Sequence, residues 1–121
     1  IGAKMAAPEK QVVAVCGDGA FQMSMFELAT IACSRIPLKI LVVRNKYLGL
    51  VREHQEKVYQ KHYSGVALDS YPHYDKLAEA YDMGFFRASS NEELPDALDQ
   101  FLACERAALM VCDVDPANNT V

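Results

Sequence analysis

The stretch that decides the fold is Val12-Val13-Ala14-Val15-Cys16-Gly17-Asp18-Gly19-Ala20-Phe21, an apolar run that ends in a glycine-rich turn. Residues 12–16 are short, continuous and rich in valine, which is typical of a strand buried on both faces of a parallel sheet. Apolar residues then recur at helical spacing and predict a helix over residues 21–34; they are Phe21, Met25, Leu28, Ala29 and Ala32. A strand, a turn and a helix in this order predict an α/β fold.

The rest of the chain continues this alternation. Residues 38–43 and 109–114 predict two more buried strands. Helices are expected over residues 48–59, over residues 74–81 after Pro72, and from the capping-box sequence Ser90-Asn91-Glu92-Glu93 to about Ala107, and residues 1–7 are typical of the last turns of a helix. We therefore expect residues 1–121 to form one α/β domain, with a doubly wound, mostly parallel sheet flanked by helices, as a truncated part of a longer polypeptide.

Composition argues against several classes of protein. The 121 residues carry 12 Lys and Arg against 16 Asp and Glu, and the resulting charge of −4 argues against nucleic-acid binding. No apolar run approaches the roughly 18–20 residues that span a bilayer, so we expect no membrane partner. The cysteines lack Cys-x-x-Cys spacing and stand in apolar stretches, so we expect buried thiols in a reduced, cytoplasmic protein; they are Cys16, Cys33, Cys104 and Cys112.

The turn Gly17-Asp18-Gly19-Ala20 is the strongest candidate for a binding site. Glycine lets the backbone turn sharply and lets a ligand approach closely, and a helix N-terminus offers N–H groups and a positive dipole end to phosphate. An aspartate repels a phosphate unless a cation separates them, so Asp18 suggests a hard metal such as Mg²⁺. An ordinary turn with Asp18 as a helix cap remains the alternative.

Asn45 follows the next predicted strand. If the two strands are neighbours, Asn45 and Asp18 lie on the same rim of the sheet and each presents an oxygen. Mg²⁺ prefers oxygen ligands and takes part of its shell from phosphates and water. A lone asparagine after a strand is also a common turn residue, and it is the pairing with Asp18 that favours a metal site.

The order Gly17-Asp18-Gly19, then 25 residues, then Asn45 resembles the motif that binds thiamine diphosphate. The surrounding sequence resembles the large subunit of acetolactate synthase (acetohydroxyacid synthase) over essentially the whole chain. The similar segments are GDGAFQMSMFELATIACSRIPLKILVVRNKYLGLVREHQE, KHYSGV, KLAEAYDMGF, EELPDAL and VCDVDP.

This resemblance implies roles for individual residues. Asp18 and Asn45 would bind Mg²⁺ through their side chains, and Tyr47 through its backbone carbonyl. Backbone N–H groups after Gly17, at Gly19 and Ala20, would bind the diphosphate, and Gly49 and Leu50 would lie close to it. The implied reaction decarboxylates pyruvate and joins the product to a second 2-keto acid, in a transferase of branched-chain amino-acid biosynthesis whose carbanion chemistry the cofactor supplies.

Two residues depart from the family pattern. Arg44 stands where the family has the first of two asparagines, and it either aids anion binding or points to solvent. His54 stands where biosynthetic members usually carry a tryptophan that favours 2-ketobutyrate, so His54 is a candidate for acceptor specificity. A solvent-facing helical histidine is the alternative.

Other parts of the implied enzyme lie outside this sequence. The glutamate that activates the cofactor belongs to another domain, which a partner subunit contributes, and FAD belongs to a central domain. The resemblance therefore implies a homo-oligomer, leaves room for a regulatory subunit, and predicts no catalytic residue in this chain and no activity for the chain alone.

Two rival hypotheses remain at this stage. Another thiamine diphosphate carboligase or decarboxylase, such as glyoxylate carboligase, shares the Leu48-Gly49-Leu50 run after Asn45. A non-catalytic phosphate-binding α/β module would instead bind phosphate ligands without preferring thiamine diphosphate.

Overall fold

Helices and strands alternate along the chain in the computed structural model, which describes residues 1–70 and 72–116. The elements are α1 (Gly2–Ala6), β1 (Val13–Gly17), α2 (Asp18–Ser24), α3 (Glu27–Cys33), β2 (Lys39–Arg44), α4 (Gly49–Val58), α5 (Tyr74–Ala80), β3 (Gly84–Ala88), α6 (Leu94–Ala103) and β4 (Ala108–Asp113). This order confirms the α/β class predicted from the apolar runs.

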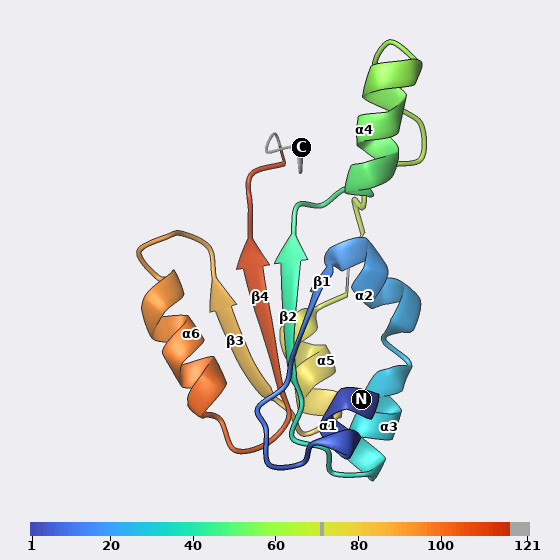
Figure 1. Ribbon diagram of the computed structural model, residues 1–121. Coiled ribbons are helices and arrows are strands. Elements are labelled where there is room, and N and C mark those ends of the chain that lie inside the picture. The colour runs from blue at the N-terminus through green and yellow to red at the C-terminus, as the bar shows by residue number, and fades with distance from the viewer. Residues whose placement is uncertain (71, 117–121) are drawn as a thin grey trace.

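The strands form one parallel sheet in the order β1-β2-β4-β3 (Figure 1). Because the strands run in the same direction, their carboxyl ends meet at one edge, where Gly17 pairs with Val43 and Arg44 with Asp113. In open α/β sheets ligands bind at this edge.

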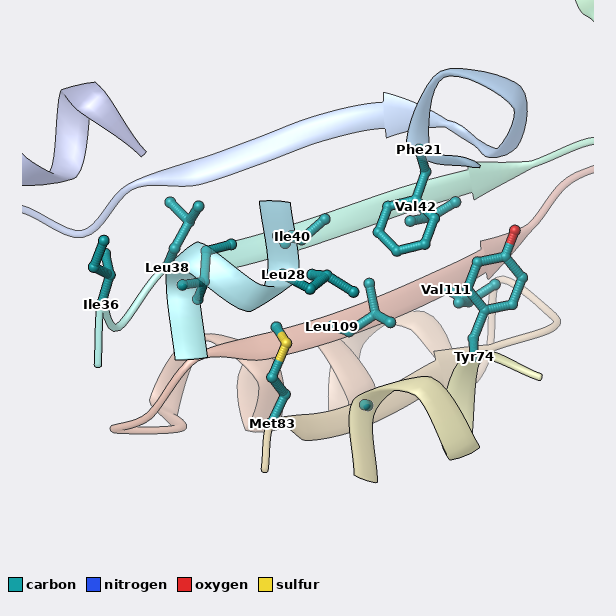
Figure 2. Packing of buried hydrophobic residues seen from close by; sticks show 12 residues of the cluster. Phe21, Leu28, Ile36, Leu38, Ile40, Val42, Tyr74, Met83, Leu109 and Val111 are labelled. Atoms are coloured by element: carbon teal, nitrogen blue, oxygen red, sulfur yellow. The ribbon is translucent and has the colours of Figure 1, made fainter. Parts of the chain in front are cut away.

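Helices cover both faces of the sheet, as expected for a doubly wound fold. On one face, α2, α3 and α5 pack over a cluster that Figure 2 shows between the helices and the central strands; its labelled members are Phe21, Leu28, Ile36, Leu38, Ile40, Val42, Tyr74, Met83, Leu109 and Val111. On the other face, α6 inserts Phe101 against Ala108 and Met110. Each face thus has its own core, and β2 and β4 lie between them.

Several predicted boundaries were wrong. The helix expected over residues 21–34 is two helices, α2 and α3, and the first begins at Asp18. The helix predicted to reach Ala107 ends at Ala103. Helix α5 does begin at Tyr74, as predicted, but Pro72 precedes its N-cap His73 and is not its first helical residue. Strand β3 was not predicted, because an arginine interrupts its short apolar run.

The predicted burial of β1 on both faces was also wrong. Val13 and Val15 are 38% and 66% exposed, because β1 is an edge strand and α6 packs over β3 and β4, at the other side of the sheet. The cysteines are likewise less buried than expected: Cys33 is exposed, and the other three are half-buried. Burial still raises the pKa of Cys16, and burial together with the charge of Asp113 raises the pKa of Cys112.

Over the described ranges, the helices are too short and too polar for any of them to cross a membrane. The longest are ten residues each.

Candidate functional site

Asp18 joins the turn after β1 to the loop after β2. Its side chain is 3% exposed, and its two carboxylate oxygens accept hydrogen bonds from different segments. Oδ1 accepts from the Gly19 N–H at 3.0 Å, and Oδ2 accepts from the Lys46 N–H at 2.8 Å. The Asp18 carboxylate thus lies against the Lys46 backbone, next to Asn45, and β1 and β2 are neighbours; the predicted roles of Asp18 and Asn45 stay predictions.

The loop after β2 is fixed from both sides. Asn45 Oδ1 accepts a hydrogen bond from the Tyr47 N–H at 2.9 Å, and Lys46 adopts a left-handed conformation with φ of 65°. Residues 46–48 also pair with residues 66–68, where the Leu48 N–H donates to Val66 O at 2.8 Å. Asn45 and the Tyr47 backbone are thus held in a defined arrangement beside Asp18.

Gly19 and Gly49 make close approach possible at this edge. A Cβ on Gly19 would lie 2.7 Å from Leu48 Cδ2, and a Cβ on Gly49 would lie 3.1 Å from Asn45 Nδ2. Gly17 differs, because its φ of −75° is ordinary and a Cβ there would meet nothing within 4 Å. These glycines therefore do not provide the sharp turn that was expected. Gly19 and Gly49 instead allow close packing.

Two helices begin beside Asp18. Helix α2 starts at Asp18 itself, and α4 starts at Gly49, after the loop that contacts Asp18. The first turn of a helix leaves backbone N–H groups without helical partners and carries the positive end of the dipole. Phe21 anchors α2, since its ring packs against the ring of Tyr74 on α5, with 5.6 Å between the ring centroids (Figure 2). The edge therefore favours an anion.

The chemistry of Asp18 fits a metal ion that arrives with an anionic ligand. Within residues 1–70 and 72–116, no cationic side chain pairs with its buried carboxylate. A buried charge without a partner is unfavourable, so a bound cation would stabilise it. The described residues also contain no group of three His, Cys, Asp or Glu side chains that could hold a metal alone. A single carboxylate suits Mg²⁺, which takes other ligands from amides, carbonyls, phosphates and water.

The other predicted site residues differ in their relation to Asp18. The Gly19 N–H, which was predicted to bind the diphosphate, donates to Asp18 Oδ1. Ala20 is exposed beside it. Leu50 is 75% exposed and His54 is exposed on α4, which Figure 1 shows projecting beyond the carboxyl edge. The His54 ring packs edge-on against Tyr59 at 5.8 Å.

Arg44 belongs to an ion network that sequence reasoning missed. Its side chain is buried, and Nε donates to Asp113 Oδ1 at 2.5 Å. Arg87 donates to Asp113 Oδ2 through Nε and Nη2, and the Ser89 hydroxyl donates to the same oxygen. Arg44 therefore does not point to solvent. No motif signalled this network, because its members come from three strands far apart in the sequence.

Ionisation of Asp113 reflects these partners. Burial on its own would raise the pKa of Asp113, but hydrogen bonds from Arg44 and Arg87 and their charges outweigh it. The pKa of the carboxyl consequently lies below its ordinary value, and the network stays charged at neutral pH.

Comparison with known proteins agrees with this geometry. Residues 1–114 match the family model described as "Thiamine pyrophosphate enzyme, C-terminal TPP binding domain", in which thiamine pyrophosphate is another name for thiamine diphosphate. The match includes the Asp18 turn, the loop after β2 and the Asp113 network.

Curated relatives match nearly the whole chain. It is 36% identical over 118 residues to the probable acetolactate synthase large subunit of Methanococcus aeolicus, covering 98% of this chain and 20% of that protein. It is 33% identical over 119 residues to the acetolactate synthase isozyme 2 large subunit of Escherichia coli (strain K12), covering 98% and 22%. With the acetolactate synthase of Mycobacterium avium it shares 41% identity over 103 residues, covering 82% and 17%. The chain thus spans about a fifth of the length of these relatives.

Proposed function

Because the chain belongs to the family of C-terminal TPP binding domains of thiamine pyrophosphate enzymes, we propose that its Asp18 edge binds the diphosphate of thiamine diphosphate through Mg²⁺. The observation that carries the proposal is the buried Asp18 carboxylate, which contacts the loop after β2 and has no cationic partner among the described residues. A diphosphate-bound cation would supply the missing charge.

Each residue at the edge has a role in this proposal. Asp18 and Asn45 bind Mg²⁺ through side-chain oxygens, and Tyr47 binds it through its backbone carbonyl. The first turns of α2 and α4, at Ala20 and at Gly49, orient N–H groups and helix dipoles toward the diphosphate. Gly19 keeps α2 close to Leu48, so that both helix termini reach one ligand.

The proposed reaction is that of an acetolactate synthase, as the names of the relatives suggest. The enzyme would decarboxylate pyruvate and condense the product with a second 2-keto acid. Thiamine diphosphate, when bound, stabilises the carbanion that this chemistry requires. The chain itself would bind and orient the cofactor: Leu50 would lie close to the diphosphate, and His54 on α4 would lie toward the acceptor.

Further properties of the enzyme are part of the same proposal. We expect a cytoplasmic homo-oligomer in which another domain supplies the activating glutamate and a central domain holds FAD, with a regulatory subunit as an additional partner. The 121-residue chain by itself should form no acetolactate. Formation of acetolactate from pyruvate by that chain would overturn this part of the proposal.

Calorimetric titration of the purified protein with thiamine diphosphate and Mg²⁺ tests the site. We expect binding that requires the metal and prefers thiamine diphosphate to inorganic diphosphate. Asp18→Asn should weaken it by about 100-fold or more, since a metal ligand is lost and loss of a supporting residue alone costs about 10–100-fold. Arg87→Gln is the matched control, because it removes a charged group from the same edge without touching Asp18.

The outcomes separate the rival hypotheses. Equal binding of any phosphate would favour a generic phosphate-binding module, and retained binding in Asp18→Asn would contradict the metal site. For the active enzyme, product analysis decides the reaction: acetolactate from pyruvate is expected, and tartronate semialdehyde from glyoxylate would indicate a glyoxylate carboligase instead.

A further inference from the structure

Helix α4 carries Leu50 and His54 but has little support from the rest of the domain. None of its residues is buried. Figure 1 shows it extending past the carboxyl edge of the sheet, away from the two cores. A helix without a buried face gains little from packing, so its direction depends on a few specific contacts.

Arg52 provides contacts from α4 to several other segments. Its guanidinium carbon lies 4.5 Å from the centroid of the Tyr47 ring and 5.4 Å from that of Tyr63. Nη1 donates a hydrogen bond to Pro116 O at 2.5 Å. One side chain thus connects α4 with the loop after β2, the loop after α4 and the segment after β4.

Gln55 makes a second connection, but to one segment only. Its side-chain amide donates to Ser64 O at 3.0 Å and accepts from the Ser64 N–H at 2.9 Å. This clamp holds the loop after α4 against the helix that precedes it. Arg52 differs because it reaches Tyr47, whose backbone is next to the Asp18 contact at Lys46.

We propose that Arg52 is a positioning residue that holds α4 and the 45–48 loop as one unit. A guanidinium suits this role, since it can lie over aromatic rings and donate in its plane at the same time. The consequence of this inference rests on the proposed function: the metal-binding loop and His54, which would lie toward the acceptor, keep fixed positions relative to each other. The contacts themselves do not depend on any ligand.

Hydrogen exchange in the ligand-free protein tests the structural step. The reporters are the Leu48 and Leu68 amides, which donate to Val66 O and Lys46 O. Arg52→Met, which keeps the length of the side chain but removes its charge and donors, should speed their exchange about three- to tenfold, given the usual strength of cation–π contacts. Arg52→Lys keeps the charge but lacks the planar guanidinium, so it should restore only part of the protection. Lys57→Met removes a cation from the exposed end of the same helix and should leave both amides unchanged.

Metal dependence tests the functional step. Arg52→Met should raise the Mg²⁺ concentration for half-maximal thiamine diphosphate binding about three- to tenfold, and Arg52→Lys should reverse only part of this rise. Unchanged exchange of the Leu48 and Leu68 amides in Arg52→Met would overturn the positioning role. Faster exchange with an unchanged metal requirement would overturn the consequence of that role for metal binding. If the wild-type protein bound no metal or cofactor, the proposed function would fail, while the exchange experiment would still decide whether Arg52 holds the loop.

Discussion

Asp18 and Asp113 are two carboxylates at the same edge of one sheet, and their surroundings differ. Asp113, at the end of β4, accepts hydrogen bonds from Arg44, Arg87 and Ser89. Asp18, directly after β1, is more deeply buried and, within the described part of the chain, accepts only from the Gly19 and Lys46 backbone N–H groups. One carboxylate is neutralised by the fold, and the other is not.

The difference indicates what each group does. Asp113 connects the ends of β2, β3 and β4, so its ion pairs stabilise the sheet. Backbone N–H groups orient Asp18 without neutralising it, which fits the proposed role of Asp18 as a cation ligand. We therefore expect changes around Asp18 to affect ligand binding and changes around Asp113 to affect stability.

Gly19→Ala should give the largest effect on the Asp18 side of this comparison. The added Cβ would lie 2.7 Å from Leu48 Cδ2, so the Leu48 side chain must leave its place between α2 and the loop after β2. We expect a loss of about 1–3 kcal/mol of unfolding free energy, as for other overpacked sites, and weaker binding of thiamine diphosphate with Mg²⁺. Urea denaturation and calorimetry measure the two effects.

Gly17→Ala is the matched control for stability. Its Cβ would meet nothing within 4 Å and its φ of −75° suits alanine, so the free energy of unfolding should hardly change. The double variant Gly19→Ala/Leu48→Ala should regain stability relative to Gly19→Ala. Equal destabilisation by Gly17→Ala and Gly19→Ala would show that close packing against Leu48 is not the cause.

Asp113→Asn should lower stability and leave the cofactor site intact. The change leaves the buried Arg44 guanidinium without its carboxylate, and loss of a charged hydrogen-bond partner costs about 1–3 kcal/mol. Urea denaturation should show this loss, and the affinity for thiamine diphosphate with Mg²⁺ should stay close to that of the wild type. A large loss of affinity at unchanged stability would reverse the assignment of the two carboxylates.

Acid stability should reveal the same network. Since the pKa of Asp113 is lowered in the folded state, the unfolded state binds a proton more readily at low pH. The contribution of Asp113 is therefore complete above the ordinary carboxyl pKa of about 4 and is lost as the pH falls through the lower folded value. As the pH is lowered, the free energy of unfolding should fall less steeply in Asp113→Asn than in the wild type. An equal pH dependence of the two proteins would contradict the prediction.

The two carboxylates also show how far sequence reasoning reaches. Asp18 was predicted as a candidate metal ligand because the signals around it are local in the sequence. A strand, two glycines and the start of a helix lie within one short stretch, and Asn45 follows the next strand. Asp113 and Arg44 were not predicted as a pair, because they are 69 residues apart and no short pattern encodes a contact across strands. The exposure of β1 was missed for a related reason, since an edge strand and a central strand can have the same apolar run.

Local patterns failed where tertiary contacts decide. The capping-box sequence before α6 does form bonds, but the Glu93 carboxylate accepts from the Ser89 N–H rather than from that of Ser90, and the helix begins at Leu94. The break between α2 and α3 at Met25 and Phe26 was hidden, because the apolar spacing continues through it.

His54→Trp should give the smallest change and affects neither carboxylate. His54 is exposed on α4 and contacts Tyr59, so stability should change by less than about 0.5 kcal/mol, as for most surface substitutions. In the active enzyme, the larger apolar ring should favour the longer acceptor, 2-ketobutyrate over pyruvate, by about tenfold or less, since one methylene in a fully apolar pocket is worth roughly 10–200-fold. Competition between the two acceptors measures the ratio. Val58→Trp is the control, because it places the same ring one turn further along α4; it should leave the ratio of the two products unchanged. An equal change of this ratio in both variants would mean that apolar surface on α4, rather than the position of His54, determines acceptor preference.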